Sequence, residues 1–460
     1  MIRRYIGDRA FYRRVLGIAV PIIIQNGITQ FVSLLDNIMV GQVGTLEMSG
    51  VSVVNGLLFV FNLCVFGMCS GAGIFTAQFH GSRDHEGVRH TLRFKLMAGL
   101  VLSALGCAIL LLWGDRLIGL YLTGEGSPEE AAATLNFGLD YLEIMLVGLV
   151  PFALSTAYAS TLRETDQTVV PMVAGIVAVL VNLVLNYVLI FDHPGWTGLG
   201  VRGAAIATVV SRYVELAVVA GWSHLNRRRV PFVQGLFRSL RIPGTLLRGI
   251  LIKGMPLLFN EFLWSTGMAI MNQCYSTCGL DVVPAMNISS TIYNLGSVVY
   301  WALGTSVGIL MGQMLGANHA EEEIRDVNRK LIFLSVLAGV AFGGLMAATS
   351  GLFPLLYNTT GSVRLLATRL ICISAVILPM NAYTHSAYFT LRSGGQTMVT
   401  FLFDSLFMWG VCVPLAFCLS RFTGIGILPL YFICQSTDIP KSIIGWFMIR
   451  KGSWIRNLTK

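Results

Sequence analysis

The feature that most constrains this chain is a succession of apolar runs, each long enough to cross a bilayer. A helix needs about 20 apolar residues to span the hydrocarbon core, and we place twelve such runs along the sequence. They are expected to begin near Val15, Ser49, Leu92, Leu135, Thr168, Leu199, Ile250, Pro284, Leu331, Leu365, Gln396 and Gly424. Because an open sheet cannot satisfy its backbone hydrogen bonds in lipid, these runs predict helices. The sequence therefore predicts an all-α polytopic membrane protein with twelve transmembrane helices.

The sparse charged residues support this class and orient the chain. Only 12% of the residues are charged, whereas about a quarter are charged in a soluble domain. Most of the 32 Lys and Arg residues fall at the two ends and in alternate loops, which predicts that both termini are cytoplasmic. The basic residues are spread over several short segments, a pattern that does not favour nucleic acid as a partner. We expect a multi-pass protein of the cytoplasmic (inner) membrane.

The two halves of the chain repeat the same motifs at one constant separation. The matched pairs are Pro21 with Pro256, Gln78 with Gln313, and Gly81 with Gly316. Each half holds six predicted helices, and since six is even, both halves enter the membrane from the same side. Such repeats are related by a pseudo-twofold axis along the membrane normal.

The repeat predicts two lobes joined by a linker. We expect an N-lobe over residues 1–225, a cytoplasmic linker over 226–247 and a C-lobe over 248–460. The linker is rich in Arg and has apolar residues between them. This composition predicts that it lies on the anionic inner surface of the membrane.

One carboxylate, Asp36, lies within the first apolar run. An Asp near the centre of a bilayer costs roughly 2.5–3.5 kcal/mol on insertion scales, and such a group usually pairs, binds an ion or exchanges a proton. Asp36 lies toward the end of its run, so a simpler interpretation is a carboxylate that reaches water. Both interpretations stay open at this point.

Further polar residues of the first half lie in the fifth and sixth runs. Asn182 and Asn186 are four residues apart, so their amides project from one face of a helix. They suit either an interior polar partner or hydrogen bonds that hold helices together. Thr208 lies in the sixth run, and the Arg212 and Glu215 that follow are interpreted as a local ion pair.

The second half carries polar groups of its own within the predicted helices. They are Asn260, Glu261, Asn381, His385, Asp404, Asp438 and Lys441. Asp438 and Lys441 are three residues apart and are expected to neutralise each other. Glu261 has no evident local partner, which makes it the second candidate carboxylate after Asp36.

Taken together, these motifs resemble the multidrug and toxic compound extrusion (MATE) family over nearly the whole chain. The Gln-x-x-Gly ends of the second and eighth runs match the family, as do the Arg residues that end the fourth and tenth. The family's first helix has an early Pro, then an Asp followed by Met-Val-Gly and a further Gly. The matching residues here are Pro21, Asp36, Met39, Val40, Gly41 and Gly44.

The resemblance implies two six-helix lobes around a central cleft. It implies a secondary antiporter that exports organic, often cationic compounds by alternating access, in exchange for protons or sodium. Asp36 would couple the ion, together with Asn182, Asn186 and Thr208, and a sodium ion would lie at Asp36, Asn182 and Asn186. No cofactor, no enzymatic activity and a monomer are expected, with small organic substrates and the lipid bilayer as partners.

The second lobe departs from the family pattern. Many members have a Glu eight residues after the Pro of the seventh run, where this chain has Trp264. Glu261 lies three residues earlier, on nearly the same helix face, and is expected to substitute. Asn381 stands where some relatives have an Asp. We therefore expect Glu261, Asn260 and Asn381 to serve substrate binding or second-lobe coupling.

Two other functions make different demands on the sequence. A flippase for a lipid-linked precursor would need a cationic cleft for pyrophosphate, and few Arg residues lie within the runs. A membrane-embedded enzyme would need a nucleophile and a base, or metal ligands, at one depth. His385 is the one His deep within a run, which disfavours that reading.

Overall fold

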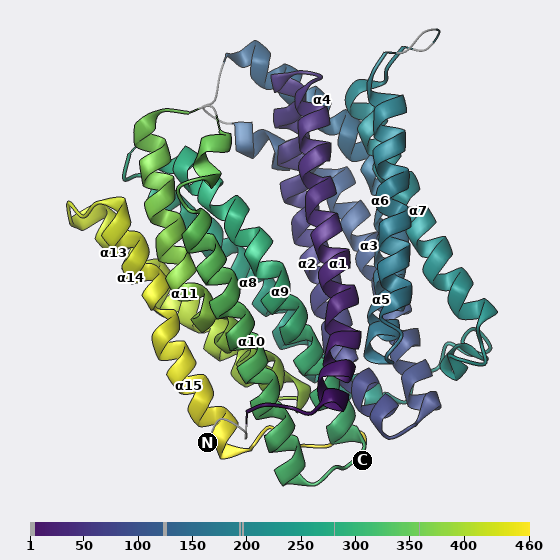
Figure 1. The fold of residues 1–460 in the computed structure, drawn as a ribbon. Helices are drawn as coiled ribbons and strands as arrows, with labels where there is room; N and C mark the ends of the chain where they lie inside the picture. Colours follow the sequence, from purple (N-terminus) through teal and green to yellow (C-terminus); the bar gives the residue numbers. More distant parts are fainter. Residues whose placement is uncertain (1–4, 123–126, 193–194, 196, 280, 358) are drawn as a thin grey trace. The chain divides into compact units, whose positions relative to one another are not determined.

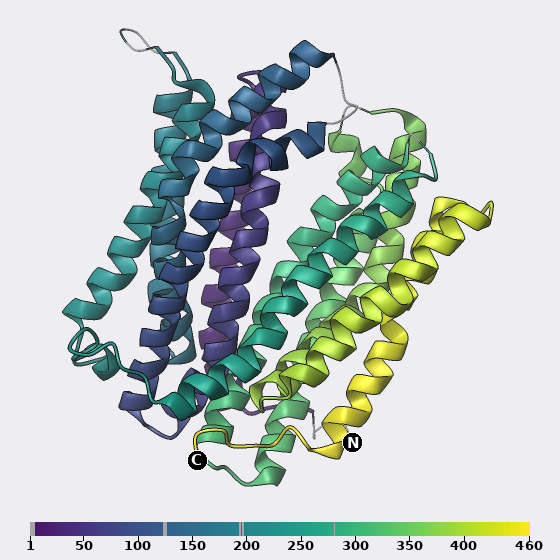
Figure 2. The same ribbon diagram turned by 180° about the vertical axis from the view of Figure 1, so that it is seen from behind.

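The computed structural model describes residues 5–122, 127–192, 195, 197–279, 281–357 and 359–460. Within these ranges, each of the twelve predicted runs falls on one helix or on one interrupted helix. The prediction of an all-α polytopic membrane protein is confirmed. Figures 1 and 2 show long helices packed along one another.

The helices of the first half follow the predicted runs closely. Their bounds are α1 (Arg9–Gly41), α2 (Thr45–Gly81), α3 (His85–Leu122), α4 (Pro128–Val147), α5 (Leu149–Glu164), α6 (Val169–Ile190) and α7 (Gly200–Leu225). The fourth run is broken into α4 and α5, which meet at an angle of 48°. Pro151 explains the break, because its ring clashes with the carbonyl of Val147 four residues earlier and it cannot donate a hydrogen bond.

The second half ends in shorter helical pieces. Its long helices are α8 (Gly244–Ser276), α9 (Val282–Gly316), α10 (Glu321–Thr349) and α11 (Gly361–Ser393). The eleventh run comprises α12 (Thr397–Phe401), two π-helical turns (Leu402–Leu406 and Met408–Cys412) and α13 (Val413–Phe422). The twelfth comprises α14 (Ile427–Ser436) and α15 (Asp438–Lys451).

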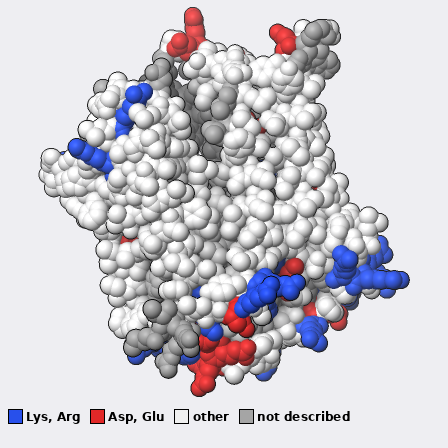
Figure 3. All heavy atoms as spheres, in the orientation of Figure 1, with Lys and Arg blue, Asp and Glu red and all other residues white. Residues whose placement is uncertain are grey.

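Length and hydropathy agree with a membrane location. Among the described residues, nine helices are long and apolar enough to cross a membrane, and the bent α4–α5 pair adds a tenth span. The remaining two runs are α8, which is interspersed with polar residues, and the interrupted α14–α15. Figure 3 shows Lys, Arg, Asp and Glu side chains near helix ends, while the helix flanks are almost free of charge. Uncharged flanks suit contact with lipid.

Contacts between residues divide the chain into two compact units. Unit 1 contains Met1–Ile23, Ala77–Arg83 and Ile252–Lys460, and unit 2 contains Ile24–Thr76 and Asp84–Leu251. The division therefore falls inside α1, just after Pro21, and inside α2, after Thr76. In unit 2, α6 packs along α7 and α3 along α5, whereas in unit 1, α9, α10 and α11 pack together. The predicted lobe boundaries stay a prediction.

The segment after α7, expected to be a surface linker, is partly packed into unit 2. Its apolar residues Phe232, Val233 and Leu236 are buried within unit 2. Arg93 of α3 holds the segment, since its guanidinium donates to the carbonyls of Gly235 and Leu236, both at 2.8 Å. These three side chains pack against protein because a short turn (Pro231–Val233) folds this part of the segment onto α3, whereas Phe237 and Leu240 are exposed.

Candidate functional site

Asp36 lies in a polar chain that links α1, α6 and α7 within unit 2. Asn186 Nδ2 donates to Asp36 Oδ1 at 2.6 Å and lies 3.2 Å from Asn182 Oδ1. Asn182 Nδ2 in turn donates to Thr208 Oγ1 at 3.3 Å. Both Asn side chains are buried, and their spacing of one helical turn places them on the same face of α6. The four residues predicted for ion coupling are thus brought together.

The two amides differ in the hydrogen bonds that they can form with Asp36. When the Asn182 amide is turned over, its nitrogen donates to both Asp36 oxygens, at 2.9 and 3.2 Å. Asn186 Oδ1 is buried and has no hydrogen-bond partner among the described residues. An amide oxygen beside a carboxylate is a suitable ligand for a hard cation. Asp36, the amides and Thr208 therefore supply the oxygen atoms that a sodium ion would need.

Two neighbours of Asp36 were not predicted from the sequence. Tyr141 of α4 is buried, lies close enough to interact with Asp36 and Thr208, and donates to Asn55 Oδ1 at 3.3 Å. Arg212 acts electrostatically on Asp36 and forms the expected ion pair with Glu215 at 3.4 Å. A Tyr in an apolar run is ordinary, so no sequence signal singled out Tyr141.

A second polar cluster lies in unit 1. Asn260 Nδ2 donates to Asp404 Oδ2 at 3.0 Å, and Ser405 Oγ donates to Asn260 Oδ1 at 2.6 Å. Lys441 lies between two carboxylates, 3.5 Å from Asp404 and 3.6 Å from Asp438. The expected Asp438–Lys441 pair is present, but Lys441 is shared with Asp404. Asp404 lies on a π-helical turn, and such turns are frequent at functional sites.

The three residues predicted for the second lobe do not share one network. Asn260 belongs to the cluster just described. Asn381 Nδ2 donates instead to the hydroxyl of Tyr293 at 2.9 Å. Glu261 is half-buried and forms no hydrogen bond or ion pair with the described residues. Glu261 is therefore a carboxylate whose charge no partner side chain balances directly.

His385 lies among aromatic rings. It stacks on Trp301 with ring centroids 5.4 Å apart and packs against Tyr388 and Phe389. Within the described ranges, no group of three or more His, Cys, Asp or Glu side chains is arranged to hold a metal ion. His385 is accordingly a packing residue in this structure.

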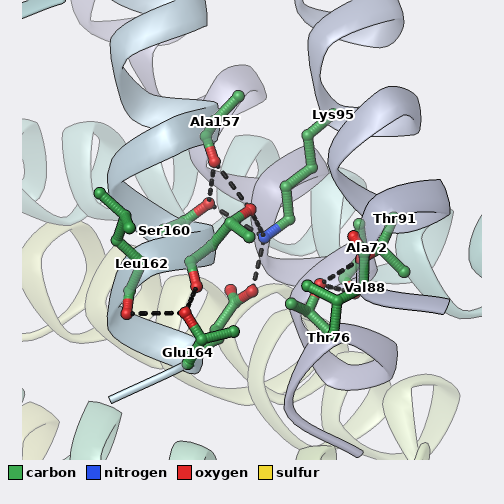
Figure 4. Close-up of polar contacts among 11 residues, drawn as sticks. Ala72, Thr76, Val88, Thr91, Lys95, Ala157, Ser160, Leu162 and Glu164 are labelled. Atoms are coloured by element: carbon green, nitrogen blue, oxygen red, sulfur yellow. Dashed lines mark hydrogen bonds and ion pairs between the residues drawn. The ribbon is translucent and has the colours of Figure 1, made fainter. Parts of the chain in front are cut away.

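Figure 4 shows an ion pair that the sequence analysis did not single out. Lys95 of α3 is fully buried, and its Nζ contacts Glu164 Oε2 of α5 at 2.6 Å. The same nitrogen donates to Ser160 Oγ at 3.0 Å and Thr161 Oγ1 at 3.1 Å. Gly73 of α2 leaves the space that the Glu164 carboxylate occupies. The pair therefore joins three helices of unit 2.

Comparison with known protein families gives one match that covers most of the chain. A model of the MatE family matches residues 21–188 and 256–418. The two matches begin at Pro21 and Pro256, which are the first pair of the internal repeat.

Curated relatives align over nearly the whole length. The chain is 23% identical to a probable multidrug resistance protein NorM of Thermotoga maritima, with 96% of this chain and 93% of that protein covered. It is 27% identical to a probable multidrug resistance protein YoeA of Bacillus subtilis, with 90% and 88% covered. It is 24% identical to the multidrug resistance protein PmpM of Pseudomonas aeruginosa, with 89% and 84% covered.

Solved structures share the fold. An outward-facing multidrug resistance MATE transporter of the MOP superfamily superposes with a TM-score of 0.85 at 19% identity, covering 98% of both chains. A MATE protein in complex with MaL6 superposes with a TM-score of 0.84, also at 19% identity and 98% coverage of both chains. These likenesses show that the chain shares the fold of these transporters, with which a twelve-helix, two-lobe architecture is consistent.

Proposed function

Because the chain belongs to the MatE family, the multidrug and toxic compound extrusion (MATE) transporters, we propose that it exports organic cations in exchange for protons or sodium. Its curated relatives are named as multidrug resistance proteins, which supports drug or toxic-compound export across the membrane. The chain is a multi-pass membrane protein, and the proposal places it in the cytoplasmic membrane as a monomer with cytoplasmic termini. We expect no cofactor besides the coupling ion.

The observation that carries the proposal is a carboxylate inside a membrane helix that is held by buried amides. Asp36 accepts a 2.6 Å hydrogen bond from Asn186, and the neighbouring side chains offer oxygen atoms to a cation. A proton or sodium ion that binds Asp36 removes a negative charge from a poorly solvated site. Loss of that charge changes which packing of the surrounding helices is favoured. Asp36 would thereby couple ion entry to the conformation of unit 2.

The inward movement of one coupling ion can drive export of a neutral substrate. Moving one positive charge inward is worth about 2.3 kcal/mol per 100 mV. This energy supports roughly a 50-fold concentration gradient of a neutral substrate. One-for-one exchange of a monovalent organic cation moves no net charge, so export of such a substrate depends instead on the concentration gradient of the coupling ion.

We assign substrate binding or a second coupling step to Glu261, Asn260 and Asn381. Glu261 supports this assignment because its carboxyl group forms no hydrogen bond or ion pair with the described residues, while Asn260 donates to the neighbouring Asp404. Asn381 would contribute through its buried Oδ1, which has no partner among the described residues.

Export of a lipid-linked precursor is the alternative function. Its pyrophosphate would require free cationic side chains within the membrane. Lys95 and Lys441 are each paired with carboxylates, so this alternative has less support.

The test is uptake of ethidium into inside-out vesicles or proteoliposomes, with a proton gradient and a sodium gradient imposed separately. We expect one gradient to drive uptake by the native chain and Asp36→Asn to abolish it. Asp140→Asn is the matched control, because Asp140 is an exposed carboxylate of unit 2 that pairs with Arg202. Undiminished uptake by Asp36→Asn would contradict the assignment of Asp36. No uptake by folded native protein under either gradient would favour the flippase.

A further inference from the structure

The two Gln-x-x-Gly motifs of the internal repeat meet each other in unit 1. A side chain at Gly81 of α2 would collide with the backbone carbonyl of Gln313 in α9. A side chain at Gly316 would likewise collide with the backbone carbonyl of Gln78. The contact is reciprocal, so the helices cross at a local pseudo-twofold contact where only glycine allows the backbones to approach. We call this contact the α2–α9 crossing.

Each glutamine of the crossing is held by a different end of the chain. Gln313 Oε1 accepts a hydrogen bond from Arg14 of α1 at 3.0 Å. Gln78 Oε1 accepts from the backbone N–H of Leu458 at 2.7 Å, and its Nε2 donates to the carbonyl of Arg456 at 3.2 Å. The Gln78 amide also donates to the carbonyl of Ser393 at 2.9 Å. Gln78 is fully buried, so losing these partners would leave an unsatisfied amide.

The segment that holds Gln78 is firmly attached to unit 1. Trp454 is fully buried and packs in the core formed by α1, α9 and α10. Gln396 Nε2 donates to the carbonyl of Ser453 at 3.0 Å, and Asn457 Nδ2 donates to Gly316 at 3.3 Å and Asn318 at 3.0 Å. Figure 2 shows the chain after α15 running across the helix ends in an extended form.

The position of the crossing gives it mechanical importance. α2 contributes Ala77 and the residues that follow to unit 1, and its preceding part to unit 2. The end of α2 is therefore a covalent link through which a movement of one unit reaches the other. Alternating access requires packed elements to move as bodies, and such a movement would pull on the crossing.

We propose that Arg14 and residues 456–458 form a lock that keeps the α2–α9 crossing closed and must release Gln78 and Gln313 when the cytoplasmic side opens. The lock rests on the transport function proposed above. In this proposal, the two glutamines of the repeated motif are gating residues. Each is held by a segment that is distant from it in the sequence.

Weakening the lock should favour the state that is open to the cytoplasm. A hydrogen bond contributes a net factor of roughly 2 to 10 to such an equilibrium. A larger open population raises the apparent affinity for a substrate presented at the cytoplasmic face. We therefore expect the KM for ethidium in inside-out vesicles to fall by roughly 2- to 10-fold for each hydrogen bond removed. A purely structural role would instead lower kcat without lowering KM.

The experiment compares three variants of the full chain. A chain that ends at Ile455 loses the contacts to Gln78 but keeps Trp454, and Arg14→Ala loses the contact to Gln313. The matched control is Gln396→Ala, which removes a contact of the same segment without touching either glutamine. Hydrogen–deuterium exchange of residues 77–83 and 313–318 is measured on each purified protein, together with its melting temperature and ethidium transport.

We expect faster exchange at the crossing and a lower KM in the first two variants, with a native melting curve, and neither effect in Gln396→Ala. Unchanged exchange in the chain ending at Ile455 would overturn the lock. An equal response of all three variants, or a general loss of folding, would show that these contacts only stabilise the fold. Either result would also overturn the proposed lock. If the native chain fails to transport ethidium, the proposed function fails, whereas the exchange measurement still decides whether the ends hold the crossing.

Discussion

At the scale of single residues, the chemistry of the Asp36 site depends on the uncharged amide of Asn186 beside the carboxylate. The Asn186 amide donates to Asp36 Oδ1 at 2.6 Å. The amide satisfies one carboxylate oxygen and adds no charge. The site consequently has one negative charge, that of Asp36, with which to attract a cation.

Asn186→Asp should strengthen ion binding at this site. Two carboxylates at hydrogen-bond distance cannot both stay ionised without a cation between them. We expect the ion concentration that gives half-maximal transport to fall by about tenfold, which corresponds to about 1.4 kcal/mol. Ethidium uptake as a function of sodium and of pH measures the change.

Asn186→Leu is the companion variant, because it removes the oxygen and nitrogen without adding charge. It should require more sodium for the same rate, because the site loses an oxygen ligand. If both variants and the native protein showed the same ion dependence, Asn186 would have no role in ion binding.

At the scale of helices, buried polar contacts fix which faces pack in unit 2. Lipid offers no hydrophobic preference among apolar helix faces, so small residues and polar bonds select the packing. Lys95 and Glu164 bring α3 and α5 together, and Gly73 of α2 makes room for the carboxylate. The ion pair therefore acts as a specific joint among three helices.

Lys95→Met should destabilise the protein more than the double variant Lys95→Met, Glu164→Gln. Removing one partner leaves an uncompensated buried charge, which costs about 3–5 kcal/mol, whereas replacing both partners costs far less. Thermal unfolding of the purified proteins measures the difference, and a double-mutant cycle gives the coupling. Equal melting temperatures for the single and double variants would argue against a buried ion pair.

At the scale of the whole molecule, the chain is a membrane protein whose two halves repeat the same sequence motifs. The two MatE matches begin at Pro21 and Pro256, and most charged side chains on the face seen in Figure 3 lie near the helix ends. The bias of Lys and Arg toward alternate loops predicts which ends face the cytoplasm.

This topology predicts opposite accessibility for two exposed positions, Arg228 after α7 and Glu129 at the start of α4. In a cysteine-free background, Arg228→Cys should react with a membrane-impermeant maleimide only in inside-out vesicles. Glu129→Cys should react only in intact cells. Labelling of both positions from the same side would contradict the predicted orientation.

The sequence by itself determined the properties that depend on neighbouring residues and on the solvent. Apolar length predicted the membrane helices, the repeated motifs predicted two equivalent halves, and a spacing of four placed Asn182 and Asn186 on one face. The family resemblance predicted that Asp36 acts together with these two residues, and the structure places all three side chains in contact.

Only the tertiary structure decided which distant residues meet. It paired Lys95 with Glu164, placed the end of the chain on Gln78, and separated Asn381 from Asn260. Apolar helix faces are nearly equivalent in lipid, so a hydrophobic pattern fixes that a helix spans the membrane but not its rotation or its neighbours. Those choices follow from close glycine contacts and buried polar bonds, which exist only when the helices are packed.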